Sequence, residues 1–173
     1  MIRENFLVGM VARLLGKMRN TSSERIASAS VWDINQIEQF LKSAILPARI
    51  SCITTDGYPH IMSLWFLYDS QCLYCSVQRR TLISKWLQNN PLCGFEIAGD
   101  NAPYKGVRGR GKVSITGAVN NPVLPLLVDK YLGSRTSPLA FSLLSREETE
   151  LTLVIKPSWM TSWDYSRRMV KSD

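Results

Sequence analysis

Histidine is nearly absent from this 173-residue sequence, in which His60 is the only one. This scarcity argues against a zinc site with several histidine ligands and against catalytic schemes that use two histidines. Long apolar runs are missing as well, and none approaches the roughly 20 residues that a membrane-spanning helix needs. Internal repeats and low-complexity stretches are also lacking. Together with the length, these absences favour one folded soluble domain without a membrane span.

Cysteine is scarce, and its spacing does not indicate a disulfide framework. The four cysteines stand at positions 52, 72, 75 and 93, and no convincing signal peptide is evident. Reduced thiols in a cytoplasmic protein are therefore expected. Cys72 and Cys75 form a CxxC pair, but they belong to a strand-like run in which positions three apart point to opposite faces. We interpret the cysteines as structural and predict no metal site.

The balance of charge favours an anionic partner. The net charge is +7, while hydrophobic residues make up 45% and charged residues 20% of the chain. Nucleic acid, a membrane surface and a phosphorylated small molecule all match a basic protein of this composition.

Residues 6–18 have apolar positions at helical spacing, with Arg13 and Lys17 on another face. Such a segment can be a membrane-surface helix, a transit peptide, or a helix that packs against the body or a partner subunit. We favour packing. Residues 19–30 are rich in Ser, Thr and Ala and are interpreted as a linker. The predicted division is an N-terminal amphipathic helix and linker over 1–30 and a barrel domain over 31–173.

The rest of the chain alternates strand and turn signals. Asp56-Gly57 predicts a tight hairpin turn, because glycine adopts the positive φ that the turn needs. Helices are expected over 33–44, with Asp33 as the cap, and after Thr81. A further helix is expected with Asn121 as its cap, Pro122 in its first turn and Gly133 at its end. Strands are predicted from Ala48 to the turn at Asp56-Gly57, over 60–68, 73–77, 92–98, 107–117 and 151–155, and, after an interruption at Pro157, over 159–163. This pattern is typical of a mainly β, α+β protein: a six-stranded antiparallel barrel with flanking helices.

The predicted strand over 60–68 is apolar on both of its alternating faces. A strand with one face exposed to solvent would have polar residues at alternate positions and would not show this pattern. We expect the barrel interior on one side, and a cofactor, a helix or a second subunit on the other.

A candidate anion site precedes the helix that begins after Thr81. Ser76, Arg79, Arg80 and Thr81 stand next to a helix N-terminus, where unpaired N–H groups and a partial positive charge suit a phosphate. The alternative is that Thr81 is an ordinary N-cap and the arginines are solvated.

A second basic cluster consists of Lys105, Arg108, Arg110 and Lys112. Cations along one strand face can bind nucleic-acid phosphates, as small barrels do. That function also calls for exposed aromatic residues on the same face, and residues 107–116 contain none. We expect no nucleic-acid partner; a solvated face, or an arginine that points at an anionic cofactor, are the alternatives.

Four stretches in a fixed order carry a family resemblance. They are ARISCITTDGYPHIMSLWFLYD, then LYCS followed by RTLISKWLQNNP, then PYKGVRGRGKVSITG, and finally KPSWMTSWDYS. The chain resembles the pyridoxamine 5′-phosphate oxidase-like, flavin-binding split-barrel superfamily. The resemblance implies a six-stranded split β-barrel that forms a homodimer with a flavin, expected to be FMN, at each of two sites along the interface.

The resemblance also implies site residues. The flavin ring would be lined by Met62, Ser63, Leu64 and Trp65. The phosphate side would be formed by Ser76, Thr81 and Lys85. The second subunit would add the loop around Tyr104 to Arg108, and Trp163. Many members carry Arg-Lys after the hydroxyl matched by Thr81, where this chain has Leu82 and Ile83; Arg79 and Arg80 would substitute for that pair.

The resemblance does not extend to a specific substrate. A C-terminal Arg-x-His, which true pyridoxamine phosphate oxidases use on their substrate, is not found, so we expect a relative of unknown substrate. Flavin chemistry occurs on the ring itself, so no catalytic side chain is assigned. His60 is a possible acid or base. The function predicted is an FMN-dependent oxidoreductase; a deazaflavin-dependent reductase and a non-catalytic flavin or haem carrier are the alternatives.

Overall fold

The structure is a computed structural model that describes residues 25–117 and 123–169. The predicted helix over 6–18 and most of the predicted linker lie outside the described residues. The predicted cap at Asn121, with Pro122, lies outside them too.

One antiparallel sheet of seven strands forms the centre of the protein, in the order β2-β1-β5-β6-β7-β4-β3. Every neighbouring pair is antiparallel, which confirms the predicted antiparallel barrel. The strands are β1 (Ala48–Ile53), β2 (Pro59–Leu64), β3 (Phe66–Asp69), β4 (Cys72–Gln78), β5 (Leu92–Ala98), β6 (Lys105–Thr116) and β7 (Glu150–Asp164).

The strand predicted over 60–68 is broken at Trp65. Its first part, β2, pairs with β1 at one end of the strand order, and its second part, β3, pairs with β4 at the other end. A single short segment therefore joins both ends of the curled sheet, which has seven strands where a six-stranded barrel was predicted.

The two strands predicted over 151–155 and 159–163 are one continuous strand, β7. Pro157 had suggested an interruption, because proline cannot donate to a sheet ladder. The structure accommodates it at a register shift between Arg110 and Gly111 of the adjacent β6.

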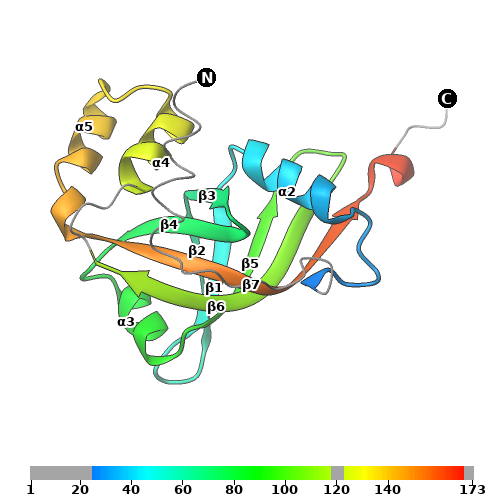
Figure 1. Cartoon of the computed structure of the whole chain (residues 1–173), viewed down its shortest axis with the longest axis horizontal. Coiled ribbons are helices and arrows are strands. Elements are labelled where there is room, and N and C mark those ends of the chain that lie inside the picture. The colour runs from blue at the N-terminus through cyan, green and yellow to red at the C-terminus, as the bar shows by residue number, and fades with distance from the viewer. Residues whose placement is uncertain (1–24, 118–122, 170–173) are drawn as a thin grey trace.

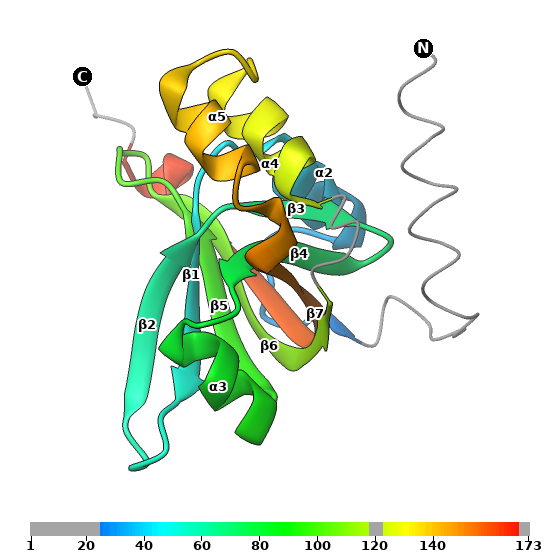
Figure 2. The ribbon, with the colours of Figure 1, turned by 90° about the vertical axis from the view of Figure 1, so that its left-hand side faces the viewer.

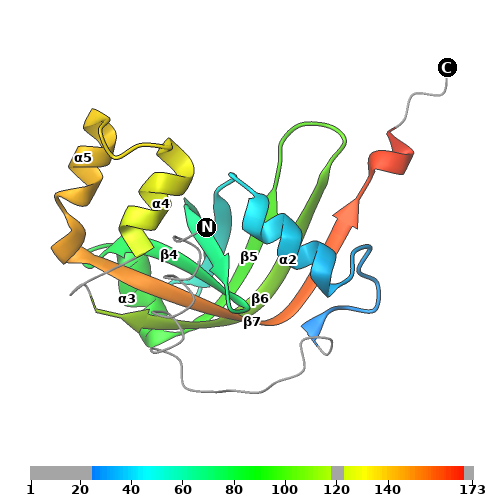
Figure 3. The same ribbon diagram turned by 45° about the horizontal axis from the view of Figure 1, so that its top comes forward.

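Helices α2 (Ile34–Ser43) and α3 (Leu82–Asn89) cover opposite ends of the curled sheet (Figure 2). Asp33 caps α2 as predicted, since its carboxylate accepts from the Gln36 N–H at 2.9 Å. Ile37 and Leu41 of α2 are completely buried, and Figure 3 shows this helix lying over the sheet. At the other end, α3 buries Ile83 and Leu87.

Helices α4 (Val123–Leu132) and α5 (Pro138–Leu144) stand together at one side of the barrel (Figure 1). Val123 and Leu127 of α4 pack against Cys72 and Tyr74 on the outer face of β4. A second apolar cluster joins α4 to α5. Gly133, with φ of 68°, ends α4 as the sequence predicts.

The last residues of the predicted linker contact β7. Ile26 forms a parallel bridge with Met160, and the Ala27 N–H donates to the Met160 carbonyl at 2.9 Å. Ser30 Oγ lies 2.9 Å from Ser162 Oγ. This part of the chain is therefore packed on the barrel.

Candidate functional site

The outer face of β2, β1, β5, β6 and β7 carries two rows of side chains set by the strand register. Ile61, Ser51, Gly94, Arg110 and Trp159 form the first row. Gly94 has no side chain, and a Cβ there would lie 2.6 Å from Ser51 Oγ, so the Ser51 hydroxyl would have to turn aside to admit one. The middle of this row is therefore low and flat.

The second row consists of Ser63, Arg49, Glu96, Arg108 and Thr161. Arg49 and Glu96 approach to 3.8 Å, and Arg49 also pairs with Asp100 at 2.7 Å. Arg49 is therefore neutralised by carboxylates, whereas Arg108 is exposed and forms none of the ion pairs found among the described residues.

Two arginines of β6 lie over tryptophans of β7 on this face. The Arg108 guanidinium carbon is 4.9 Å from the Trp163 ring centroid, and that of Arg110 is 5.8 Å from the Trp159 centroid. A Cβ on Gly106 would lie 2.8 Å from the Trp163 ring, so the missing side chain allows close packing. Strand β6 has no aromatic residues of its own on this face, and the adjacent strand β7 supplies them. The sequence of β6 alone could not show this.

The four residues predicted to line a flavin ring lie in different environments. Met62 and Leu64 pack against the barrel core. Ser63 is exposed on the outer face. Trp65 stacks on Tyr131 of α4, with ring centroids 4.8 Å apart and planes within 3°. The side chain of Ser63 and the backbone of edge strand β2 are therefore the parts of this segment open to a ligand.

Side chains of α4 hold the break at Trp65 in place. The Tyr131 hydroxyl accepts from the Phe66 N–H at 3.2 Å and donates to the Leu46 carbonyl at 2.8 Å. Lys130 Nζ donates to the Phe66 carbonyl at 3.1 Å and lies 4.3 Å from the Phe66 ring centroid. Burial lowers the pKa of Lys130 to about 8 and raises the pKa of Tyr131 to about 12.

The predicted phosphate residues lie near the start of α3. Arg79, Arg80 and Lys85 are exposed. Thr81 occupies the N-cap position, but its hydroxyl donates to the Gln78 carbonyl at 2.7 Å and makes no capping hydrogen bond. Thr81 is therefore the N-cap residue, as the alternative interpretation has it, but its side chain does not cap the helix.

Ser76, predicted on the phosphate side, lies beside a buried carboxylate. Its hydroxyl and Glu150 Oε2 are 2.8 Å apart, and Glu150 is only 6% exposed. A carboxylate repels a phosphate, so the environment of Ser76 favours an anion less than the sequence suggested.

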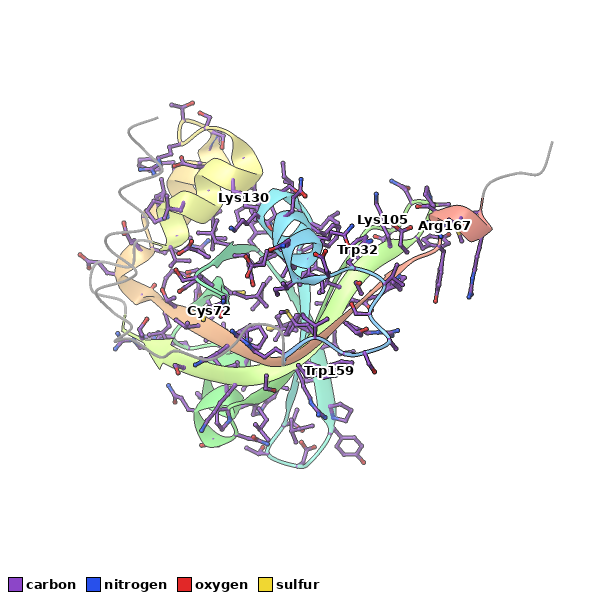
Figure 4. The ribbon with its side chains drawn as sticks, turned by 45° about the vertical axis from the view of Figure 1, so that its right-hand side comes forward. Trp32, Cys72, Lys105, Lys130, Trp159 and Arg167 are labelled. Carbon is purple, nitrogen blue, oxygen red and sulfur yellow. The ribbon has the colours of Figure 1, made fainter. Side chains whose placement is uncertain are left out.

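Tyr104, Arg108 and Trp163 lie at the far end of β6 and β7. Arg108 and Trp163 form the stacked pair described above, and the Tyr104 carbonyl accepts from the Tyr165 N–H at 3.0 Å. Figure 4 shows Lys105 and Arg167 near this end, by the C-terminal turn. This group and the α3 group occupy separate parts of one chain.

No model of a known protein family matches the chain, and no curated protein matches it by sequence. Solved structures do. Protein Rv2991 from Mycobacterium tuberculosis, described as conserved and hypothetical, is 17% identical, with 90% of this chain and 96% of that chain covered and a TM-score of 0.69. An F420 reductase is 21% identical over 71% of this chain and 94% of its own, with a TM-score of 0.61.

A candidate pyridoxamine 5′-phosphate oxidase from Listeria innocua is 15% identical, with 76% and 97% covered and a TM-score of 0.56. The chain has the pyridoxamine 5′-phosphate oxidase-like split-barrel fold. The fold predicted from the four sequence stretches is thereby confirmed. Other structures that share this fold are an FAD-binding protein from Mesorhizobium loti and the haem storage protein HutZ from Vibrio cholerae.

His60, Tyr68 and Tyr74 of this split barrel face its packed regions. His60 is half-buried and meets the Trp86 ring of α3 edge-on, with centroids 4.8 Å apart. Burial raises the pKa of Tyr68 and of Tyr74. These groups contribute packing, and they lie away from the outer-face rows.

All four cysteines of the split barrel are free and buried. Cys72 packs with the outer α4 cluster and Cys75 with the barrel core, in agreement with strand alternation. Burial raises the pKa of Cys75 and of Cys93 to about 12, so both thiols stay protonated. In the part of the chain that the structure describes, His, Cys, Asp and Glu side chains form no cluster suited to a metal ion, and no helix has the length and apolar character to cross a membrane.

Proposed function

We propose that this split barrel binds FMN and acts as an FMN-dependent oxidoreductase in a homodimer. The observation that carries the proposal is the outer face, where the flat region at Ser51 and Gly94 is flanked by Arg108–Trp163 and Arg110–Trp159. A flat surface bordered by cations and aromatic rings suits a planar, anionic cofactor.

Proteins of the same fold support a cofactor of the flavin type. One is an F420 reductase and another is an FAD-binding protein. Their identities to this chain are 21% and 14%, so what they share with it is the fold, and the proposed function rests on the residues of the site.

The residues of this chain fit a flavin in part. Ser63 and the backbone of β2 are available to the ring, and Arg79, Arg80 and Lys85 are available to the phosphate. A bound flavin supplies hydride acceptance and donation at its own ring. The protein then binds and orients the ring and keeps water from it, which explains why no acid–base pair is needed.

The residues available to bind the phosphate differ from those of many relatives. Leu82 and Ile83 stand where those relatives carry Arg-Lys; Leu82 is 61% exposed and Ile83 is 1% exposed. Neither side chain can bind an anion. The phosphate contacts therefore fall to Arg79, Arg80 and Lys85.

The homodimer would cover the open outer face. Ile53, Ile61 and Leu92 are 40%, 66% and 61% exposed, and all three point outward. Burying them against a second copy is favourable at roughly 25 cal/mol per Å² of apolar surface. In this arrangement Tyr104, Arg108 and Trp163 of one copy would complete the cofactor site of the other. The buried reduced thiols are compatible with the proposed cytoplasmic location.

Absorbance spectroscopy and FMN titration of the purified protein test the proposal. We expect a flavin spectrum and a solution mass of twice the 19.6 kDa chain. Arg80→Ala and Lys85→Ala should each weaken FMN binding by about 1.5–3 kcal/mol, the range for a hydrogen bond to a charged group. Lys42→Ala on α2 is the control, since it removes the same charge from an exposed site. Unchanged FMN affinity in both variants would remove their phosphate role.

A deazaflavin is the second candidate cofactor, because an F420 reductase shares this fold. A colourless protein that binds only a deazaflavin would support this candidate. A haem band would indicate carriage instead, and salt-sensitive binding of single-stranded nucleic acid without any chromophore would indicate a basic nucleic-acid barrel.

A further inference from the structure

We infer that a pocket between the start of α3 and the turn η2 (Glu147–Thr149) binds a phosphate or diphosphate group, with Arg146 as a ligand beside Arg79 and Arg80. The pocket has a volume of about 520 Å³. Its lining comes from two segments far apart in the sequence: Gln78, Arg79 and Arg80, and Arg146, Glu148 and Thr149.

Pairing of β4 with β7 brings the two segments together. Gln78, the last residue of β4, pairs with Glu150, the first residue of β7. One step further, the Arg79 N–H donates to the Thr149 carbonyl at 2.9 Å. The backbone on both sides of the pocket is therefore fixed by the sheet and its extension.

The charges in the pocket favour an oxyanion. Three arginines line it against one carboxylate, Glu148. No carboxylate within residues 25–117 and 123–169 forms an ion pair with Arg79, Arg80 or Arg146. Like charges gathered without counter-ions repel one another, and a doubly charged oxyanion removes that repulsion. Guanidinium groups suit phosphate because their N–H donors bind it in pairs.

Arg146 is held in a way that leaves donors available. Its Nε donates to the Ser142 carbonyl at 3.1 Å, and its terminal nitrogens make no hydrogen bond to another described residue. On the opposite side, α3 starts at Leu82, two residues after Arg80, and Thr81 makes no side-chain capping hydrogen bond, so the positive end of the helix follows the arginines that line the pocket.

The pocket differs from the helix positions that the family resemblance marks, since Leu82, Ile83 and Lys85 do not line it. The inference adds Arg146 to the arginines that the proposed function assigns to a phosphate, and its test with pyrophosphate does not require flavin binding. Two sources of the phosphate are possible: the phosphate end of FMN, or a separate phosphorylated ligand.

Inorganic pyrophosphate is the probe, with binding measured by isothermal titration calorimetry at low salt. We expect Arg146→Gln to weaken pyrophosphate binding by about ten-fold or more, as expected for loss of a charged hydrogen bond. Glu148→Gln should tighten binding, because it removes the one repelling carboxylate. Arg167→Gln is the matched control: it changes the net charge equally, but it lies at the C-terminal end of the molecule, opposite α5 (Figure 1). Arg146 is exposed, so its substitution should leave the fold intact.

The inference is overturned if wild-type protein does not bind pyrophosphate, if Arg146→Gln and Arg167→Gln bind it equally, or if Glu148→Gln weakens binding. Titrations with FMN and riboflavin separate the two sources. Loss of FMN affinity without loss of riboflavin affinity in Arg146→Gln assigns the pocket to the cofactor's own phosphate. Unchanged FMN affinity with weakened pyrophosphate binding assigns it to a separate ligand. Failure of both flavins to bind would refute the proposed function alone, while the pyrophosphate titrations still decide the pocket.

Discussion

Replacement of Tyr131 by phenylalanine should destabilise the barrel at the point where its sheet ends meet. The Tyr131 hydroxyl joins α4 to the first residue after the break and to the segment before β1, accepting from the Phe66 N–H and donating to the Leu46 carbonyl. Tyr131→Phe removes this bridge but keeps the ring that stacks on Trp65. The variant therefore isolates the contribution of one hydroxyl group.

The magnitude follows from the two hydrogen bonds, at 3.2 and 2.8 Å. Each contributes about 0.5–1.5 kcal/mol net, so their loss should lower the free energy of unfolding by about 1–3 kcal/mol. Phe66 is fully buried, so its N–H is left without water as a substitute partner. We therefore expect a value in the upper half of that range.

Urea denaturation followed by far-UV circular dichroism measures the effect, with linear extrapolation to water. Tyr58→Phe is the control, because Tyr58 is 70% exposed and its loss of a hydroxyl should change stability little. An unfolding free energy for Tyr131→Phe within about 0.5 kcal/mol of the control, no more than the smallest value expected for one of the two hydrogen bonds, would refute the role of the hydroxyl.

Three further predictions concern pH, packing and thiol reactivity. Burial lowers the pKa of Lys130 from 10.5 to about 8, so between these pH values the unfolded chain binds more protons than the folded one, and rising pH stabilises the fold. The unfolding free energy of the wild type, relative to that of Lys130→Met, should therefore increase from about pH 8 to about pH 10. A difference in urea midpoints that stays constant over this pH range would contradict this. Gly106→Ala places a Cβ 2.7 Å from a backbone carbonyl oxygen and should lower the free energy of unfolding, measured by thermal denaturation, by about 1–3 kcal/mol. Gly99→Ala is the control and should be tolerated, because the nearest atom to its Cβ would be 3.9 Å away. All four buried thiols should react with a disulfide reagent only as fast as the barrel opens, with Cys75 and Cys93 the slowest; rapid labelling of the native protein would show that they are accessible.

Local patterns in the sequence were sufficient to predict the strands and helices that depend only on residues close together in the chain. Val107 and Val113 face inward and Arg108 and Arg110 outward along β6, because alternation is a property of the strand itself. The cap at Asp33 and the end of α4 at Gly133 are local in the same sense. The antiparallel barrel followed from the order of these elements.

Contacts between distant segments were decided only by the tertiary structure. Trp163 lies under Arg108, and Glu150 beside Ser76, because β7 inserts between β6 and β4. The predicted continuous strand over 60–68 could not reveal that it would pair with both ends of the sheet and break at Trp65.

The same distinction between local patterns and contacts between distant segments applies to the candidate site. Arg79 and Arg80 were identified from their position before a helix, whereas Arg146 is recognised only where the pairing of β4 with β7 brings it to the same pocket. Spacing along a chain encodes which side of an element a residue occupies. Strand register, which depends on packing across the whole sheet, determines which residues meet.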